Sequence, residues 1–142
     1  MFFAFDNRLK VVNYNLKTDK VSGPVKLALV ADLHCCLYGE NQSELIDAID
    51  KYKPDAVLLA GDIFDDYYVN ANSHILINNI VQKYKIYYVS GNHEWWSGKM
   101  YEHFKYLKNA GVTVLKCDST AAVADCALPR RAINEYSAGL SV

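Results

Sequence analysis

The chain has 142 residues, of which 51% are hydrophobic and 22% are charged. With 15 lysines and arginines against 16 aspartates and glutamates, the formal net charge is -1. This balance argues against a basic surface for polyphosphates or nucleic acid, and the composition is too apolar for a disordered chain. We expect one soluble globular domain that needs neither disulfides nor a structural metal to stay folded.

Charged residues interrupt every apolar run, so no stretch reaches the roughly 20 apolar residues of a membrane-crossing helix. The apolar start, residues 1–5, is too short for a signal-peptide core and lacks a basic lead-in. We therefore expect a cytoplasmic protein, with membrane association through this short start as the alternative. No CxxC spacing is present, so reduced thiols are expected at Cys35, Cys36, Cys117 and Cys126.

Short β-rich runs alternate with amphipathic segments along most of the chain. The alternating run 9–16 is predicted to be an edge strand or half of a hairpin that closes near residues 22–24. The nearly continuous apolar run 25–31 predicts a strand buried on both faces of a parallel sheet. A helix should follow, with Ser43 as its N-cap and Pro54 as its stop.

The same alternation continues toward residue 115, where the apolar spacing predicts strands at 56–60, 86–89 and 112–115 and helices at 72–83 and 99–110. Four strand–helix steps indicate the α/β class, with a mostly parallel sheet, helices on its faces and right-handed crossovers. Beyond that point the chain becomes rich in alanine and loses its strand rhythm. We therefore divide it into a domain of residues 1–116 and an atypical Ala-rich tail of residues 117–142, with a weak helix near 121–128 as one option.

Three polar clusters each follow the carboxyl end of a predicted buried strand, where open α/β sheets bind ligands. Adjacent parallel strands lie about 4.8 Å apart, so side chains at these ends are expected to converge. Their carboxylate, imidazole and amide oxygen ligands suit Mn, Fe, Zn or Mg, and their glycines let the backbone approach ions closely. The clusters are Asp32 and His34 in ADLH, Gly61, Asp62 and Asp65 in GDIFD, and Gly91, Asn92, His93 and Glu94 in GNHE.

Two metal ions are a reasonable expectation at this edge. A carboxylate on the middle strand, Asp62, can bridge two ions about 3.5 to 4 Å apart, with Asp32 and His34 on one side and Asn92 on the other. Such a pair activates water and holds a phosphoryl group for in-line attack.

These motifs resemble the D-x-H, G-D-x-x-D and G-N-H-[DE] motifs of the calcineurin-like metallophosphoesterase family, in the same order. Their first positions, Asp32, Asp62 and Asn92, are spaced evenly by 30 residues, which accommodates one strand–helix–strand unit each. The surrounding residues are particularly similar to bacterial phosphohydrolases of that family. The resemblance covers about residues 25–116 and implies the N-terminal half of an αββα sandwich.

The resemblance also implies hydrolysis of phosphate mono- or diesters at a binuclear metal centre. By position it makes Asp32 and His34 ligands of one metal, Asp62 the bridge, Asn92 a ligand of the other metal and His93 the group that acts on the leaving group. Asp65 and Glu94 would not bind metal themselves but would orient the residues that do. Directly after them, Trp95 and Trp96 are close enough to contact a leaving group.

The family continues with a lone metal-binding histidine and a G-H-x-H motif, and this sequence has neither. We therefore expect a truncated or frameshifted form, or a fragment, whose metal binding is impaired. The alternative is a non-catalytic remnant that binds metal weakly and self-associates through an incomplete sheet. His74 and His103 are expected to be surface or packing residues instead of replacement ligands. A nucleotide-binding doubly wound domain is disfavoured because neither GxGxxG nor GxxxxGK[ST] occurs.

Overall fold

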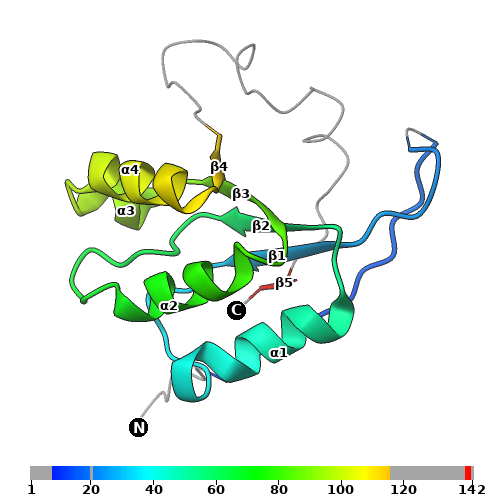
Figure 1. Ribbon diagram of the computed structural model, residues 1–142, viewed down its shortest axis with the longest axis horizontal. Coiled ribbons are helices and arrows are strands. Elements are labelled where there is room, and N and C mark those ends of the chain that lie inside the picture. The colour runs from blue at the N-terminus through cyan, green and yellow to red at the C-terminus, as the bar shows by residue number, and fades with distance from the viewer. Residues whose placement is uncertain (1–7, 20, 116–139, 142) are drawn as a thin grey trace, which may run out of the picture.

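A computed structural model describes residues 8–19, 21–115 and 140–141 of the chain. Its five strands form one parallel sheet in the order β4-β3-β2-β1-β5 (Figure 1). The strands are β1 (Leu27–Ala31), β2 (Ala56–Ala60), β3 (Lys85–Val89), β4 (Thr113–Val114) and β5 (Leu140–Ser141). The helices are α1 (Ser43–Tyr52), α2 (Ala71–Ile80), α3 (Asn92–Trp96) and α4 (Met100–Ala110), with a short 3-10 turn, η1 (Glu40–Gln42), before α1.

The predicted α/β class is confirmed, because β1, β2 and β3 each pair in parallel with the next strand along the chain and a helix lies in each of these connections. The predicted strand at 56–60 coincides with β2. Gly111, which directly follows the predicted helix at 99–110, is the C-cap of α4 and has a positive φ of 97°. A glycine adopts this conformation without the steric cost that a Cβ would bring.

One face of the sheet packs against the helices. Val30, Leu59 and Tyr88 lie side by side across β1, β2 and β3, and each is almost completely buried. They belong to one apolar cluster with side chains from all three long helices, so these helices cover the same face. The helical members include Leu45 and Ile49 of α1, Leu76, Ile77 and Ile80 of α2, and Phe104 and Leu107 of α4.

The opposite face of the sheet is less covered. Leu29, Leu58 and Tyr87 form the neighbouring row across β1, β2 and β3, and each is only half-buried. Burial of the first of these strands on both faces was predicted, whereas the described elements bury one face fully and the other in part.

The predicted strand at 9–16 is wrong, since residues 8–19 contain no helix or strand. An extended segment becomes a strand only when a neighbour accepts its backbone hydrogen bonds, and alternation alone supplies no neighbour. Ser43 is the first residue of α1 instead of its N-cap; Gln42 holds that position in a left-handed conformation. The Gln42 side chain accepts a hydrogen bond from Tyr38 N (2.9 Å) and donates one to Cys36 O (2.7 Å).

Three elements were not predicted: the 3-10 turn η1, the short helix α3 and the strand β5, which pairs with β1 through Val30 and Ala31. Most of the predicted tail, with its optional helix near 121–128, lies outside the described residues, so the boundary after residue 116 stays a prediction. None of the helices in the described ranges has the length and hydropathy that crossing a membrane requires.

Candidate metal centre

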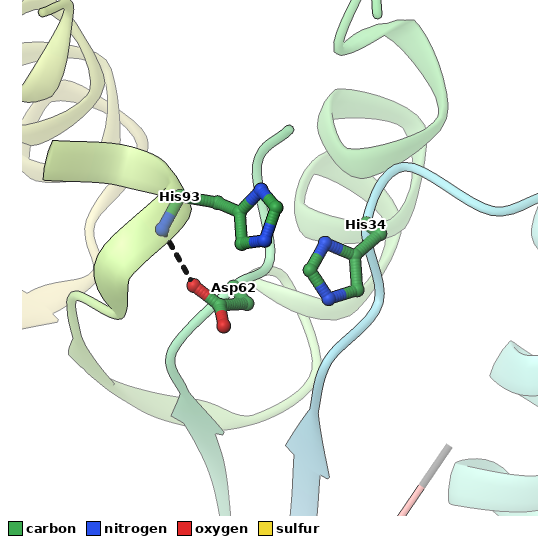
Figure 2. A group of neighbouring side chains, drawn as sticks. All are labelled: His34, Asp62 and His93. Atoms are coloured by element: carbon green, nitrogen blue, oxygen red, sulfur yellow. Dashed lines mark hydrogen bonds between the residues drawn. The ribbon is translucent and has the colours of Figure 1, made fainter. Parts of the chain in front are cut away.

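The polar clusters lie together at the carboxyl edge of the sheet. Asp32 directly follows β1, Asp62 lies two residues beyond β2, and Asn92 opens α3 shortly after β3. Figure 2 shows the loops after β1 and β2 and the start of α3 meeting at this edge. The architecture therefore places the three sequence motifs side by side.

His34, Asp62 and His93 form the centre of this arrangement. One potential ligand atom from each lies within 4.8 Å of the others. The two imidazole rings meet edge to face, with centroids 4.4 Å apart, and Asp62 Oδ1 accepts a hydrogen bond from His93 N at 2.9 Å (Figure 2). Opposite ligands on an ion with bonds of about 2.1 Å are about 4.2 Å apart, so small movements would bring the His34 and Asp62 atoms onto one ion, with the His93 ring beside it. A carboxylate with an imidazole fits a borderline divalent cation.

Two of the four expected ligands lie at the rim of this group. Asp32 Oδ1 is 4.0 Å from His34 Nε2, and the Asp32 side chain is 60% exposed. Asn92 is exposed at the start of α3. The structure thus groups His34 and Asp62 with His93, the residue expected to act on the leaving group, and places Asp32 and Asn92 at the solvent side.

Sequence reasoning missed Asp66. Its Oδ1 lies 2.8 Å from His93 Nδ1, and this hydrogen bond is the main reason that the pKa of His93 lies above its usual value. The signal in the sequence was the doubled aspartate at the end of GDIFDD, of which the family motif uses only the first.

That first aspartate, Asp65, is buried and faces the other histidine, with Oδ2 3.6 Å from His34 Nδ1. Burial raises the pKa of Asp65, but hydrogen bonds from the backbone N–H groups of Tyr67 and Tyr68 outweigh this effect and the pKa is lowered overall. The carboxylate is therefore held in its charged form beside the imidazole, as an orienting role requires.

Glu94 is completely buried behind the centre. Its Oε2 accepts hydrogen bonds from Asp62 N (3.0 Å) and Gly91 N (2.8 Å), and its Oε1 accepts them from Ile63 N (2.8 Å) and Phe64 N (3.1 Å). One side chain thereby ties the loop after β2 to the start of α3. This cross-link stabilises the start of the short helix α3, which was not predicted.

The loops at this edge approach each other closely. A Cβ on Gly61, which has a φ of +88°, would lie 3.0 Å from Gly91 Cα, and a Cβ on Gly91 would lie 2.6 Å from Asp62 N. Asp32, His34 and Asp62 also have positive φ, between 44° and 53°. Backbone hydrogen bonds from Asp32 N to Gly61 O (3.2 Å) and from His34 N to Asp62 O (2.9 Å) hold them there.

The calcineurin-like phosphoesterase family matches the chain over residues 25–129. A Caenorhabditis elegans protein provisionally named a metallophosphoesterase is 30% identical over 100 residues, which cover 66% of this chain and 20% of that protein. Proteins from two strains of Helicobacter pylori, each named an uncharacterized metallophosphoesterase, are 26% identical over 111 residues, or 76% of this chain and 30% of theirs.

The chain thus spans less than a third of the length of these curated relatives. No solved structure matches it significantly. The family match covers well over half of the sequence and includes all three motifs at the sheet edge. The chain therefore belongs to the calcineurin-like phosphoesterase family.

Proposed function

We propose that the site at the carboxyl edge of the sheet hydrolyses phosphate mono- or diesters with two divalent metal ions. Asp32 and His34 bind one ion, Asp62 bridges, and Asn92 binds the other. His93 acts as general acid on the leaving group. The observation that carries this proposal is the grouping of potential ligand atoms of His34, Asp62 and His93 within 4.8 Å of one another.

The bound ions, from the set Mn, Fe, Zn and Mg, supply an activated water and neutralise phosphoryl charge. The His93 side chain supplies the proton, and the Asp66 side chain orients the His93 ring. Asp66 engages Nδ1 of His93 at 2.8 Å, which leaves Nε2 as the nitrogen that carries a proton to the departing oxygen. The raised pKa of His93 supports this role, because it keeps more of the imidazole protonated near neutral pH.

The test is metal content and turnover in the same preparation. Because the missing histidine motifs are expected to impair metal binding, the measurement is made with Mn²⁺ in excess. Wild type is then expected to bind close to two ions per chain and to hydrolyse an aryl phosphate, whereas Asp62→Asn loses both. Asp47→Asn removes an exposed carboxylate from α1 and serves as the matched control. Absence of metal binding in the wild type, or equal metal binding in Asp62→Asn, would refute the proposal.

A second candidate function is association without catalysis. The half-buried apolar row Leu29, Leu58 and Tyr87 favours it, because burying such a row against another apolar surface is worth about 25 cal/mol per Å². Sedimentation velocity over a hundredfold concentration range measures this directly. Dimers that dissociate in Leu58→Lys would support self-association, and a strict monomer at all concentrations would exclude it.

A further inference from the structure

A second group of potential metal ligands lies beside the metal centre, at the other edge of the His93 ring. Asp65, Asp66 and His93 each offer one ligand atom, and these atoms all lie within 4.8 Å of one another. Asp66 Oδ1 is 2.8 Å from Nδ1 of His93, whereas Figure 2 shows the other ring nitrogen turned toward Asp62 and His34. The two groups therefore share the His93 ring but use different nitrogens of it.

Asp65 has one carboxylate oxygen that is available to an ion. Its Oδ1 accepts hydrogen bonds from the backbone N–H groups of Tyr67 (2.8 Å) and Tyr68 (3.1 Å). Its Oδ2 lies 3.6 Å from His34 Nδ1, which is too far for a hydrogen bond. Among the described residues this oxygen therefore has a charged neighbour but no hydrogen-bond donor, and a bound ion would supply the missing partner.

The loop that carries both carboxylates is held in place by the chain itself. Asp65 N donates to Asn70 Oδ1 at 2.7 Å, and Asn70 Nδ2 donates back to Asp65 O at 3.1 Å. Cys35 Sγ donates to Val69 O at 3.0 Å, which ties this loop to the loop after β1. An ion bound here would not have to order the loop, and such preorganisation favours binding.

The three side chains are shielded from water, unlike the acidic groups that are common on protein surfaces. Those of Asp65, Asp66 and His93 are 8%, 12% and 26% exposed. Two carboxylates held this close together repel each other, and one divalent ion would balance their charge. Binding of the ion would therefore relieve a repulsion and would bury no uncompensated charge.

The types of ligand atom favour Zn²⁺. Imidazole nitrogen with carboxylate oxygens suits Zn²⁺, which binds such ligands more tightly than Mn²⁺ does, whereas Mg²⁺ prefers octahedral sites made of oxygen. Zn²⁺ often takes three protein ligands and one water in a tetrahedron. Ligand atoms on such an ion, with bonds of about 2.0 to 2.1 Å, lie about 3.4 Å apart, so small side-chain movements would complete the site.

We propose that Asp65 Oδ2, Asp66 Oδ1 and His93 Nδ1 form a Zn²⁺ site that is separate from the catalytic pair of ions and inhibits hydrolysis. The inhibition rests on the proposed function, in which His93 donates a proton to the leaving group while Asp66 orients its ring. An ion at Nδ1 takes the place of the proton shared with Asp66, and that proton passes to solvent. The ring is then held by the ion instead of by Asp66 and carries a proton at Nε2 only, so turnover falls.

The first experiment measures Zn²⁺ binding without catalysis, in metal-stripped Asp62→Asn, where the catalytic pair is expected not to form. Calorimetric titration is expected to show one site. Adding Asp66→Asn should weaken this site at least about 10-fold, because even the loss of a residue that only supports a ligand costs about 10- to 100-fold. Adding Asp65→Asn, which keeps an oxygen for the Tyr67 and Tyr68 N–H groups, should weaken it similarly. Adding Asp47→Asn, an exposed position on α1, should leave it unchanged.

Nitrogen NMR of the imidazoles identifies the ligand atom in the same variant. Zn²⁺ is expected to shift the resonance of His93 Nδ1 and to leave Nε2 protonated. A shift of Nε2 alone would place the ion in the catalytic group and overturn the proposal. Absence of Zn²⁺ binding to Asp62→Asn, or equal binding with and without Asp66→Asn, would overturn it as well.

The second experiment measures inhibition, with Mn²⁺ supplied and Zn²⁺ added in steps to an aryl phosphate assay. Wild type and Asp47→Asn are expected to lose half of their turnover at the same Zn²⁺ concentration, whereas the residual turnover of Asp66→Asn should require at least about 10-fold more. The same midpoint in all three proteins would overturn the inhibitory role. If no ester is hydrolysed, the proposed function fails, and the titration of Asp62→Asn still decides whether the Zn²⁺ site exists.

Discussion

Glu94 is the residue whose replacement tests the architecture of the centre most directly. Its two oxygens accept four backbone N–H groups from the loop after β2 and the start of α3, and the side chain is completely buried. Glu94→Gln preserves the shape but leaves one oxygen acceptor and adds an NH₂ donor. Two of the four N–H groups then face another donor in a site that water does not reach.

Each buried donor that loses its acceptor costs about 1 to 3 kcal/mol, so Glu94→Gln is expected to lower the free energy of unfolding by about 2 to 6 kcal/mol. The free energy of unfolding of a domain of this size is about 5 to 15 kcal/mol in total, so the expected decrease is a large fraction of it. Urea unfolding followed by circular dichroism measures it. The matched control is Glu40→Gln, an exposed position in η1 where a change within about 0.5 kcal/mol is expected.

The same variant has a second readout in metal affinity. Because Glu94 fixes the backbone at Asp62 and Gly91, a folded Glu94→Gln protein should bind Mn²⁺ about 10- to 100-fold more weakly. Unfolding free energies that are equal in Glu94→Gln and Glu40→Gln would refute the hydrogen-bond reasoning, whatever the metal affinity.

Gly91→Ala is expected to reduce Mn²⁺ binding in calorimetry, because the new Cβ would lie 2.6 Å from Asp62 N and force the loop to shift; unchanged binding would contradict the close approach. In metal-free protein, Asp66→Asn should lower the pKa of His93, which the hydrogen bond raises in wild type, as followed by NMR titration of the imidazole protons. With the pKa raised, His93 stabilises the fold below its ordinary pKa of about 6.5, and this contribution disappears as pH rises through the raised value. His103 acts with the opposite sign, since burial lowers its pKa: stability is lost as pH falls below about 6.5, and His103→Gln should flatten the unfolding free energy between pH 7 and 5.

The sequence predicted the sheet well because each buried strand has its own local signature. The apolar run at 56–60 coincides with β2, and polar motifs begin where the strands end. The segment 9–16 has the alternation of a strand but lacks the pairing that makes one, which no local pattern reports. The strand β5 is two residues long and depends entirely on β1 for its pairing, so it leaves no periodic signal.

The sequence predicted most of the residues that form the site, but it did not predict all of the contacts between them. The motifs identify Asp62 and His93 as neighbours because they follow adjacent strands. Which aspartate reaches His93 depends on the path of a tight loop: the backbone N–H groups of Tyr67 and Tyr68 occupy Asp65 Oδ1, and Asp66 is the one that bonds to the imidazole. A one-residue change of partner of this kind follows from loop geometry and not from motif spacing.

The backbone at this edge adopts conformations that its residues do not favour by themselves. Asp32, His34 and Asp62 all have left-handed φ angles, each at a cost of about 1 to 2 kcal/mol relative to right-handed backbone. Such strain persists only where surrounding contacts hold it, and here the inter-loop hydrogen bonds and the buried Glu94 carboxylate do so. These hydrogen bonds join groups of the chain itself and need no ion. The loops that carry the proposed ligands are therefore positioned before metal binds, which reduces the ordering that an incoming ion has to impose.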